Sequence, residues 1–262
     1  LQHLLLQEDF HALVMTSANR TDEPICIGNR EAIARLNGIA DLFLTHNRDI
    51  LVRCDDSVAM TLDGEPYLLR RARGYVPRPL ILARQLPPVL ALGAHQKVTV
   101  CILKQDRAFL SQHIGDMETP QARDFFHETI RLMKKITECD PEIVAHDLHP
   151  GYYSTQVAGS LGGSRVIGVQ HHHAHIVSCM AEHGLTGRVI GIAMDGTGWG
   201  DDGKVWGGEF LVADWLGYER AGHFRYFMLP GGEQAVRHPW RSAAGLLREA
   251  YGNEWPEVAA RI

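Results

Sequence analysis

The chain has few cysteines, and they are not arranged as a structural framework. There are five among 262 residues, an odd number, widely spaced and without a pair separated by two residues: Cys26, Cys54, Cys101, Cys139 and Cys179. This pattern argues against a disulfide framework and against a zinc ribbon within these residues. Buried free thiols in a cytoplasmic protein are the simplest interpretation, and Cys179 is expected to be one of them.

Long apolar runs and an excess of positive charge are also missing. No run approaches the ~20 apolar residues of a membrane-spanning helix, and the net charge is −5, whereas a general nucleic-acid binder is usually basic. We therefore expect neither a membrane nor a nucleic acid as a partner. The chain begins Leu1-Gln2-His3, with no methionine and no signal-peptide pattern, which suggests a piece of a longer protein.

Histidine is the residue present in excess, with fifteen copies, four of them between positions 170 and 175. The residues that follow have helical periodicity, so His171 and His175, one turn apart, share a face and suit a divalent metal ion. His172 and His173 are expected to point elsewhere, toward solvent or a ligand. A polar helix start with histidines bonded to backbone or water is the plain alternative, and the spacing alone shifts the balance toward a ligand site only modestly.

A third metal ligand, preferably a carboxylate, is predicted at Asp195, where the apolar strand after the histidine helix ends. We expect the strands before and after this helix to be parallel neighbours. Their carboxyl ends and the helix N-terminus would then form one edge of a sheet. This arrangement would bring Asp195 close to His171.

The periodicity of the sequence predicts mixed α/β architecture in two parts. Five arginines and four prolines between positions 70 and 88 indicate a linker, so we place a domain boundary near residue 82, giving domains 1–82 and 83–262. The expected helices are 29–40, 121–138, 152–159 and 172–183. The expected strands are 12–15, 42–44, 67–69, 89–94, 97–103, 108–112, 143–148, 166–170, 189–195 and 205–213. Strands followed by strand–helix alternation favour a mixed sheet covered by helices.

Glycines alternate after Asp195, at Gly196, Gly198 and Gly200, between two predicted strands. Such a turn lets the backbone approach a phosphate group, as in nucleotide binders of the actin and sugar-kinase class. A plain hairpin with its tip at Gly203 is the alternative, but it does not explain the three earlier glycines.

Several longer motifs, taken together, resemble the central part of the HypF carbamoyltransferase family. The motifs of a YrdC-like domain are Val14-Met15-Thr16-Ser17-Ala18-Asn19, His46-Asn47-Arg48-Asp49-Ile50, Asp55-Asp56-Ser57-Val58 and Arg70-Arg71-Ala72-Arg73-Gly74-Tyr75-Val76-Pro77. Those of a TsaD-like domain are Leu110-Ser111-Gln112-His113-Ile114-Gly115-Asp116, His146-Asp147-Leu148-His149-Pro150-Gly151-Tyr152, the histidine cluster, the stretch from Asp195 to Glu209, and Leu229-Pro230-Gly231-Gly232. The resemblance implies the C-terminal portion of a YrdC-like twisted sheet domain followed by the N-terminal portion of an actin/sugar-kinase-like, TsaD-like mixed-sheet domain.

The resemblance also implies a reaction. The YrdC-like part would form carbamoyl-adenylate from carbamoyl phosphate and ATP with its magnesium ion, and Ser17, Asn19 and Arg71 or Arg73 match its nucleotide and substrate positions. The TsaD-like part would transfer the carbamoyl group to the C-terminal cysteine of HypE in [NiFe]-hydrogenase maturation. Here the zinc or iron ligands would be His171, His175 and Asp195, while Gly196, Gly198 and His172 would contact nucleotide or substrate.

Two alternatives stay open at this point. An antibiotic O-carbamoyltransferase joins the same two domain types in the reverse order, and the YrdC-like motifs come first here. A non-catalytic piece that binds metal and nucleotide is the other alternative, because the resemblance covers neither the acylphosphatase and zinc-finger parts of the family nor the second half of the TsaD-like part.

Overall fold

A computed structural model describes the chain except residues 1, 8, 9 and 262. It forms two compact units, Leu1–Gly168 and Val169–Ile262. No helix among the described residues is long and apolar enough to cross a membrane.

The N-terminal part of the first unit contains little regular structure. It holds α1 (Gln2–Leu5), α2 (Asn29–Leu36) and an antiparallel hairpin of β1 (Val58–Leu62) and β2 (Glu65–Arg70). The hairpin confirms the strand predicted at 67–69, whereas the helix predicted to reach residue 40 ends at Leu36, because Gly38 takes the left-handed φ of 83°. The runs 12–15 and 42–44 form no strand, since no described segment pairs with them.

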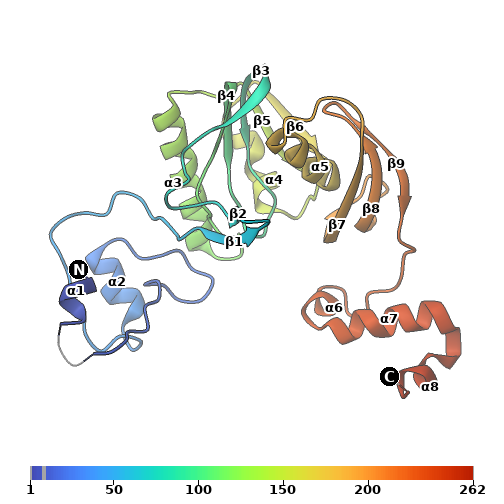
Figure 1. The fold of residues 1–262 in the computed structure, drawn as a ribbon, viewed down its shortest axis with the longest axis horizontal. Coiled ribbons are helices and arrows are strands. Elements are labelled where there is room, and N and C mark those ends of the chain that lie inside the picture. The colour runs from blue at the N-terminus through green and yellow to red at the C-terminus, as the bar shows by residue number, and fades with distance from the viewer. Residues whose placement is uncertain (1, 8–9, 262) are drawn as a thin grey trace. The chain divides into compact units, whose positions relative to one another are not determined.

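The rest of the first unit is built on a four-stranded sheet in the order β4-β3-β5-β6 (Figure 1). Its elements are β3 (Leu80–Ala91), β4 (Cys101–Leu110), α3 (Pro120–Thr137), β5 (Ile143–Asp147), α4 (Tyr153–Val157), the 3-10 turn η1 (Ala158–Ser160) and β6 (Arg165–Val169). Strand β3 runs antiparallel to β4 and parallel to β5, so the sheet is mixed, as expected.

The prediction that the prolines end regular structure is wrong, because β3 runs through Pro87 and Pro88. Its pairing with β4 shifts register between Ile81 and Leu86 and again before Val89. Such irregular stretches of a ladder tolerate residues without an N–H group. The same long pairing makes β4 one strand, where two short ones were expected.

Helix α3 begins and packs as its sequence predicts. The Thr119 side chain accepts a hydrogen bond from the Ala122 N–H at 3.2 Å, and a proline occupies the first turn. Phe125, Phe126 and Ile130 lie on its buried face. With residues of β3, β4 and β5 they form the apolar core of this unit.

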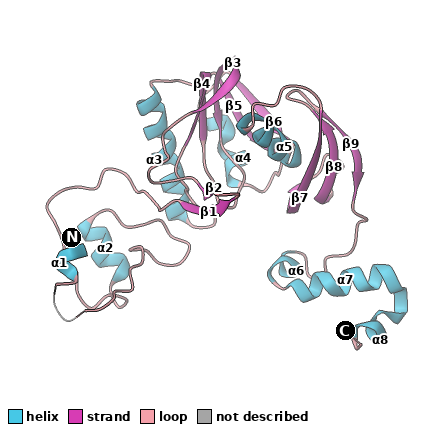
Figure 2. Ribbon diagram, viewed as in Figure 1, coloured by secondary structure: helices cyan, strands magenta, loops and turns pink. Residues whose placement is uncertain are grey.

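The second unit contains an antiparallel three-stranded sheet, β7-β8-β9, drawn in magenta in Figure 2. Its elements are α5 (His171–Glu182), β7 (Val189–Trp199), β8 (Val205–Ala213), β9 (Tyr218–His223), α6 (Glu233–Arg237), α7 (Pro239–Tyr251), η2 (Gly252–Glu254) and α8 (Trp255–Ala259). The expectation that β6 and β7 are parallel neighbours is wrong. They belong to different sheets, because β7 pairs with β8 across a tight hairpin.

Candidate functional site

Three predicted metal ligands, His171, His175 and Asp195, converge in the second unit, and we call them the metal cluster. The Asp195 Oδ2 atom lies 2.9 Å from His171 Nε2 and 3.7 Å from His175 Nε2. The two Nε2 atoms are 3.2 Å apart. The first turn of α5 thus supplies the imidazoles and β7 supplies the carboxylate.

The spacing within the metal cluster fits one ion. Ligand atoms bound at 2.0–2.2 Å to one zinc ion lie roughly 3–3.5 Å from each other, which the three measured separations bracket. The Asp195 Oδ2 atom is shielded from solvent and makes no hydrogen bond of regular geometry with any described residue. Two nitrogens and one oxygen directed at a common point are a donor set that suits zinc or iron.

An irregularity in β7 places Asp195 at this point. The ladder pairs Met194 with Gly208 and next Gly198 with Trp206, so three residues of β7 face one residue of β8. Asp195 is the first residue of this bulge, and its Oδ1 accepts the Gly196 N–H at 2.7 Å. The bulge turns the strand locally, which a plain strand ending at residue 195 would not do.

The electrostatics of the cluster favour an ionised Asp195. Burial raises the pKa of this carboxyl, but its contacts with the imidazoles of His171 and His175 and the hydrogen bond from Gly196 lower it more. The net pKa lies well below the ordinary value. The carboxylate therefore carries its negative charge at neutral pH, as a metal ligand must.

Solvent and a ligand were the two directions predicted for His172 and His173. His172 does not face solvent, because its ring is completely buried, and burial lowers its pKa. Contact of His172 with a nucleotide or substrate stays a prediction. His173 bonds through Nε2 to the Asp214 carbonyl at 2.8 Å. Cys179 is exposed, since it lies on the outer side of α5, so the expectation of buried thiols fails there.

Of the predicted phosphate glycines, Gly196 and Gly198 lie within β7, which continues to Trp199 and does not end at Asp195 as expected, and Gly200 follows directly after it. The hairpin tip follows at Gly203, where φ is 71°, as the plain-hairpin alternative predicted. Gly198 lies directly against the rings of His171 and His172. Contact of Gly196 or Gly198 with a nucleotide stays a prediction.

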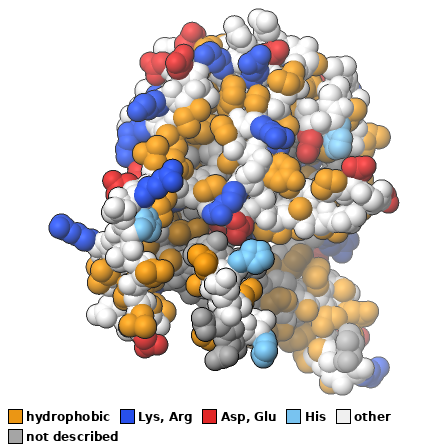
Figure 3. Space-filling view, turned by 60° about the vertical axis from the view of Figure 1, so that its left-hand side comes forward, with side chains coloured by type: hydrophobic (Ala, Val, Ile, Leu, Met, Phe, Trp, Pro, Cys, Tyr) orange, Lys and Arg blue, Asp and Glu red, His pale blue; other side chains and the backbone are white. Residues whose placement is uncertain are grey.

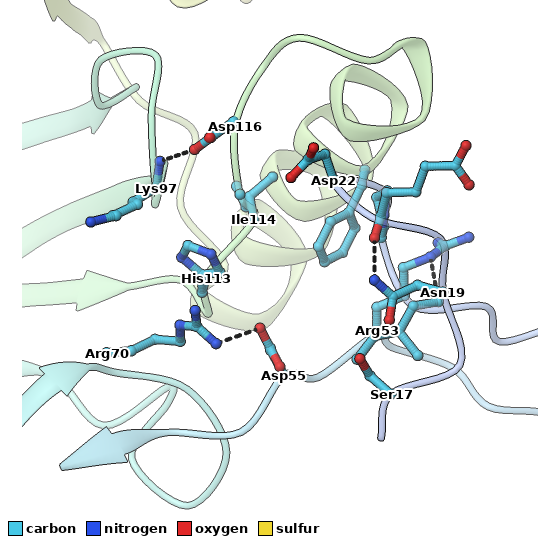
Figure 4. A pocket seen from close by; sticks show the side chains of 15 residues that line it. Ser17, Asn19, Asp22, Arg53, Asp55, Arg70, Lys97, His113, Ile114 and Asp116 are labelled. Carbon is cyan, nitrogen blue, oxygen red and sulfur yellow. Dashed lines mark hydrogen bonds and ion pairs between the residues drawn. The ribbon is translucent and has the colours of Figure 1, made fainter. Parts of the chain in front are cut away.

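A second candidate site lies in the first unit, where loops of the N-terminal part meet loops that follow β3 and β4 (Figure 4). This junction pocket has a volume of about 340 Å³. It is lined by Ser17, Asn19, Asp22, Glu23, Pro24, Ile25, Arg53, Asp55, Arg70, Lys97, His113, Ile114, Gly115, Asp116 and Phe125. Two residues predicted from the resemblance, Ser17 and Asn19, therefore lie at one cavity.

The Asn19 side chain is held in a definite orientation. Its Nδ2 donates to the carbonyls of Arg20 and Glu23 at 3.0 and 2.9 Å. Its Oδ1 is buried and has no hydrogen-bond partner among the described residues. An oriented acceptor of this kind suits an N–H donor of a ligand.

The arginines predicted to hold phosphate are placed differently. Arg71 does not line the junction pocket; its guanidinium donates to the Arg78 carbonyl at 2.9 Å. Arg73 lines an adjacent cavity of about 380 Å³, which also includes Ser17, and its Nη2 donates to the Cys54 carbonyl at 3.1 Å. The position of Arg71 follows from the turn after β2, which directs its side chain back onto backbone carbonyls.

The charged residues that line the junction pocket were not among the site residues expected from the sequence. Arg70 pairs with Asp55 at 2.9 Å, and His113 lies beside them in Figure 4. Burial and the charge of Arg70 lower the pKa of His113. Arg70 and His113 each belong to a motif that carries the family resemblance. Their spacing in the sequence did not predict that these two motifs meet at one pocket.

Comparison with family models shows the class of protein. Residues 1–72 match the YrdC-type model described as telomere recombination. Residues 84–182 match the HypF Kae1-like domain, and residues 191–262 match the second subdomain of the carbamoyltransferase Kae1-like domain. The chain thus joins YrdC-like and Kae1-like regions, in the order that favours HypF over the O-carbamoyltransferases.

Individual relatives narrow the class. Carbamoyltransferase HypF2 of Cupriavidus necator is 50% identical over 250 residues, covering 93% of this chain and 31% of the relative. The HypF of Synechocystis is 44% identical over 257 residues, covering 97% of this chain and 33% of the relative. The chain belongs to the HypF family and spans about a third of the length of these curated relatives.

Solved structures agree with this assignment. The chain resembles a full-length HypF crystallised in a phosphate- and nucleotide-bound form, with a TM-score of 0.89 and 48% identity, covering 96% of this chain and 40% of that one. It resembles the HypF of T. kodakarensis with a TM-score of 0.87 and 39% identity, covering 95% of this chain and 33% of that one. The α/β fold expected from the sequence is thereby confirmed.

Proposed function

We propose that this chain is the part of an ATP-dependent carbamoyltransferase that contributes to forming carbamoyl-adenylate and to transferring its carbamoyl group. The observation that carries the proposal is the convergence of His171, His175 and Asp195 in a chain of the HypF family. In functional terms we divide the chain into an adenylate-forming part, 1–82, and a transfer part, 83–262.

In the adenylate-forming part, the substrates would be carbamoyl phosphate and ATP with magnesium. The unpartnered Oδ1 of Asn19 is suited to accept a hydrogen bond from an amino group of the substrate. Ser17 lines both neighbouring cavities, and Arg73 lines one of them. A guanidinium at that place would match phosphate oxygens. The nucleotide-bound form of a relative supports ATP as the cosubstrate.

In the transfer part, His171, His175 and Asp195 would hold a zinc or iron ion. Such an ion supplies charge neutralisation for a phosphate and orientation for a carbonyl group. Gly196 in the adjacent bulge is exposed and leaves backbone accessible for a phosphate of the nucleotide, whereas the expected contact of Gly198 would involve a buried residue of β7. These residues would hold the carbamoyl group in place, close to the incoming thiolate.

The acceptor in this proposal is the C-terminal cysteine of HypE, in the maturation of [NiFe]-hydrogenase. The names of the relatives support carbamoyl transfer, and the HypF family supports this acceptor. A cytoplasmic location belongs to the proposal, because all five cysteines of the chain are free thiols.

Replacing one histidine tests the transfer part. In the full-length protein that contains this chain, His175→Ala is expected to reduce carbamoylation of a HypE C-terminal peptide by about 100-fold or more, the loss typical when a catalytic metal site is impaired. His183→Ala, an exposed histidine at the end of the same helix, is the matched control. Transfer by His175→Ala at the wild-type rate would contradict the metal site.

Replacing Asn19 tests the adenylate-forming part. Asn19→Ala is expected to weaken ATP or carbamoyl phosphate binding by roughly 5- to 10-fold, since one hydrogen bond contributes ~1 kcal/mol. Calorimetric titration of each ligand measures this, with Asn253→Ala on the exposed turn η2 as control. Unchanged affinity for both ligands would remove Asn19 from the site.

A further inference from the structure

Gly198 on β7 is covered on one side by two histidine rings. A β-carbon placed there would lie 2.5 Å from His172 Cε1, 3.1 Å from His172 Nδ1 and 2.9 Å from His171 Cδ2. The two carbon distances are shorter than real contacts allow. The backbone at Gly198 does not take a positive φ, so the rings, and not the chain conformation, require a glycine here.

The position of the His172 ring is fixed by the residue that begins the helix. Gln170 caps α5: its Oε1 accepts the His173 N–H at 2.8 Å. The Gln170 Nε2 atom is thereby directed at the Trp199 carbonyl, 3.2 Å away, and at His172 Nδ1, 3.3 Å away. Because Nδ1 accepts this bond, the neutral His172 ring carries its proton on Nε2.

These contacts join the first turn of α5 to the end of β7. Gln170 bonds to Trp199, and the buried His172 ring lies against Gly198 and near the indole of Trp206, the two ring centroids being 5.9 Å apart. His171 is next in sequence to His172 and touches the same glycine. The closeness of helix and strand at Gly198 therefore sets how near His171 comes to Asp195, three residues earlier on β7.

We propose that Gly198 is a positioning residue for the metal cluster: its missing side chain lets His171 and His172 close onto β7, so that His171 Nε2 reaches Asp195. The inference rests on the proposed metal site. It assigns Gly198 a role different from that of Gly196, where a β-carbon would meet no atom within 4 Å. Two glycines that serve only to expose backbone to a phosphate would not differ in this way.

The test is the Zn²⁺ affinity of the full chain, measured by competition with a chromophoric chelator. Gly198→Ala is expected to lower the affinity by about 10- to 100-fold, the range for residues that position metal ligands. Gly187→Ala, in the loop before β7 where a β-carbon would also meet no atom within 4 Å, is the matched control, with a change of at most about twofold. A Gly198→Ala variant with wild-type affinity would overturn the proposal.

A second variant separates positioning from general damage to the fold. Removal of the His172 ring relieves the closest contact of the added methyl group, at 2.5 Å, and leaves the contact of 2.9 Å with His171 Cδ2. In a His172→Ala background, Gly198→Ala should therefore cost clearly less Zn²⁺ affinity than it does in the wild type. If Gly198→Ala alone does not fold, the double variant is expected to fold. An equal loss in both backgrounds, or a double variant that also fails to fold, would contradict the proposal.

The His175→Ala variant separates failure of the proposed metal site from failure of the role proposed for Gly198. Loss of zinc in His175→Ala together with full affinity in Gly198→Ala leaves the metal site standing and rejects the role of Gly198. Wild-type protein that binds neither zinc nor iron rejects the metal site, and the role of Gly198 with it.

Discussion

The metal cluster and the junction pocket are supported in different ways. The metal cluster lies on α5 and β7, which pack against each other through an apolar core that includes Ile176, Met180 and Leu211. The junction pocket is lined mostly by loop residues between positions 17 and 116, together with Arg70 at the end of β2 and Phe125 on α3. Among the described residues before Gly74, only Pro24, Cys26, Leu36 and Ala72 are buried apolar side chains.

Charged groups take the place of a core around the junction pocket. Arg53 bonds to the Ile25 carbonyl at 2.9 Å, pairs with Glu31 at 3.1 Å and with Glu128 of α3 at 2.6 Å, and its guanidinium lies 5.6 Å from the Phe125 ring centre. The network connects the N-terminal loops to α3. A region held in this way depends on charge, and so on pH and salt, more than a region held by apolar packing.

Several apolar side chains of the N-terminal region are exposed, so apolar packing stabilises this region less than it stabilises the region around the metal cluster. Val14, Leu42 and Leu44 are more than 90% exposed, at 97%, 91% and 95%. Figure 3 shows hydrophobic side chains interspersed with charged ones on the face that it presents. These side chains contribute little to holding the loops in place, which leaves that task to the ionic network.

The largest effect is expected at the metal cluster. Asp195→Asn removes the charge of one ligand and should weaken Zn²⁺ binding by roughly 1,000-fold, because a four-ligand site contributes ~10–16 kcal/mol in total. Chelator competition measures this, with the exposed Asp140→Asn as control. Nucleotide affinity at the junction pocket should not change. A loss confined to nucleotide binding would reverse the assignment of the two sites.

A smaller effect is expected when the ionic network is broken. Arg53→Ala removes the links to Glu31 and Glu128 and should make local opening of residues 20–55 easier by about 2–3 kcal/mol. Hydrogen exchange of these amides measures the opening, with the exposed Arg30→Ala as control. Amides of α3 should keep their protection, since that helix is held by the apolar core. An equal loss of hydrogen-exchange protection in residues 20–55 and in α3 would contradict the view that these two regions are stabilised in different ways.

The smallest expected effect is on how the stability of the N-terminal region depends on pH through Glu31. Burial raises the pKa of Glu31, but hydrogen bonds from the Ile27 and Gly28 N–H groups and from Arg53 and Arg35 lower it to about 2, from 4.5. A carboxyl whose pKa is depressed by folding stabilises the folded state above its unfolded pKa and loses this contribution as the pH falls through its folded pKa.

Glu31→Gln should therefore destabilise the 20–55 segment by ~1 kcal/mol at pH 7. The difference from the wild type should stay constant down to about pH 5, shrink between about 4.5 and 2, and vanish below 2. The opening free energy from hydrogen exchange across this range measures it. A difference that persists at pH 2 would show that shape, and not charge, is what Glu31 contributes.

Residues close in sequence were predicted well, and residues brought together by distant loops were not. His171, His175 and Asp195 converge as predicted, although β7 does not end at Asp195 and the parallel neighbour expected for it is wrong. Arg53 and His113 were not proposed as pocket residues. No spacing rule connects residue 53 with Glu128, because their contact depends on how an N-terminal loop packs against helix α3.

Helix α3, the histidine helix, the strand that carries Asp195 and the family of the chain were all predictable from the amino-acid sequence. Each of these follows from periodicity, capping or local motifs, which act over a few residues. Three other features became visible in the folded molecule: Pro87 and Pro88 lie within a strand, the His172 ring is buried against Gly198, and Arg70 and not Arg71 lines the pocket. These outcomes depend on partner strands and side-chain volumes from distant segments, which no local pattern contains.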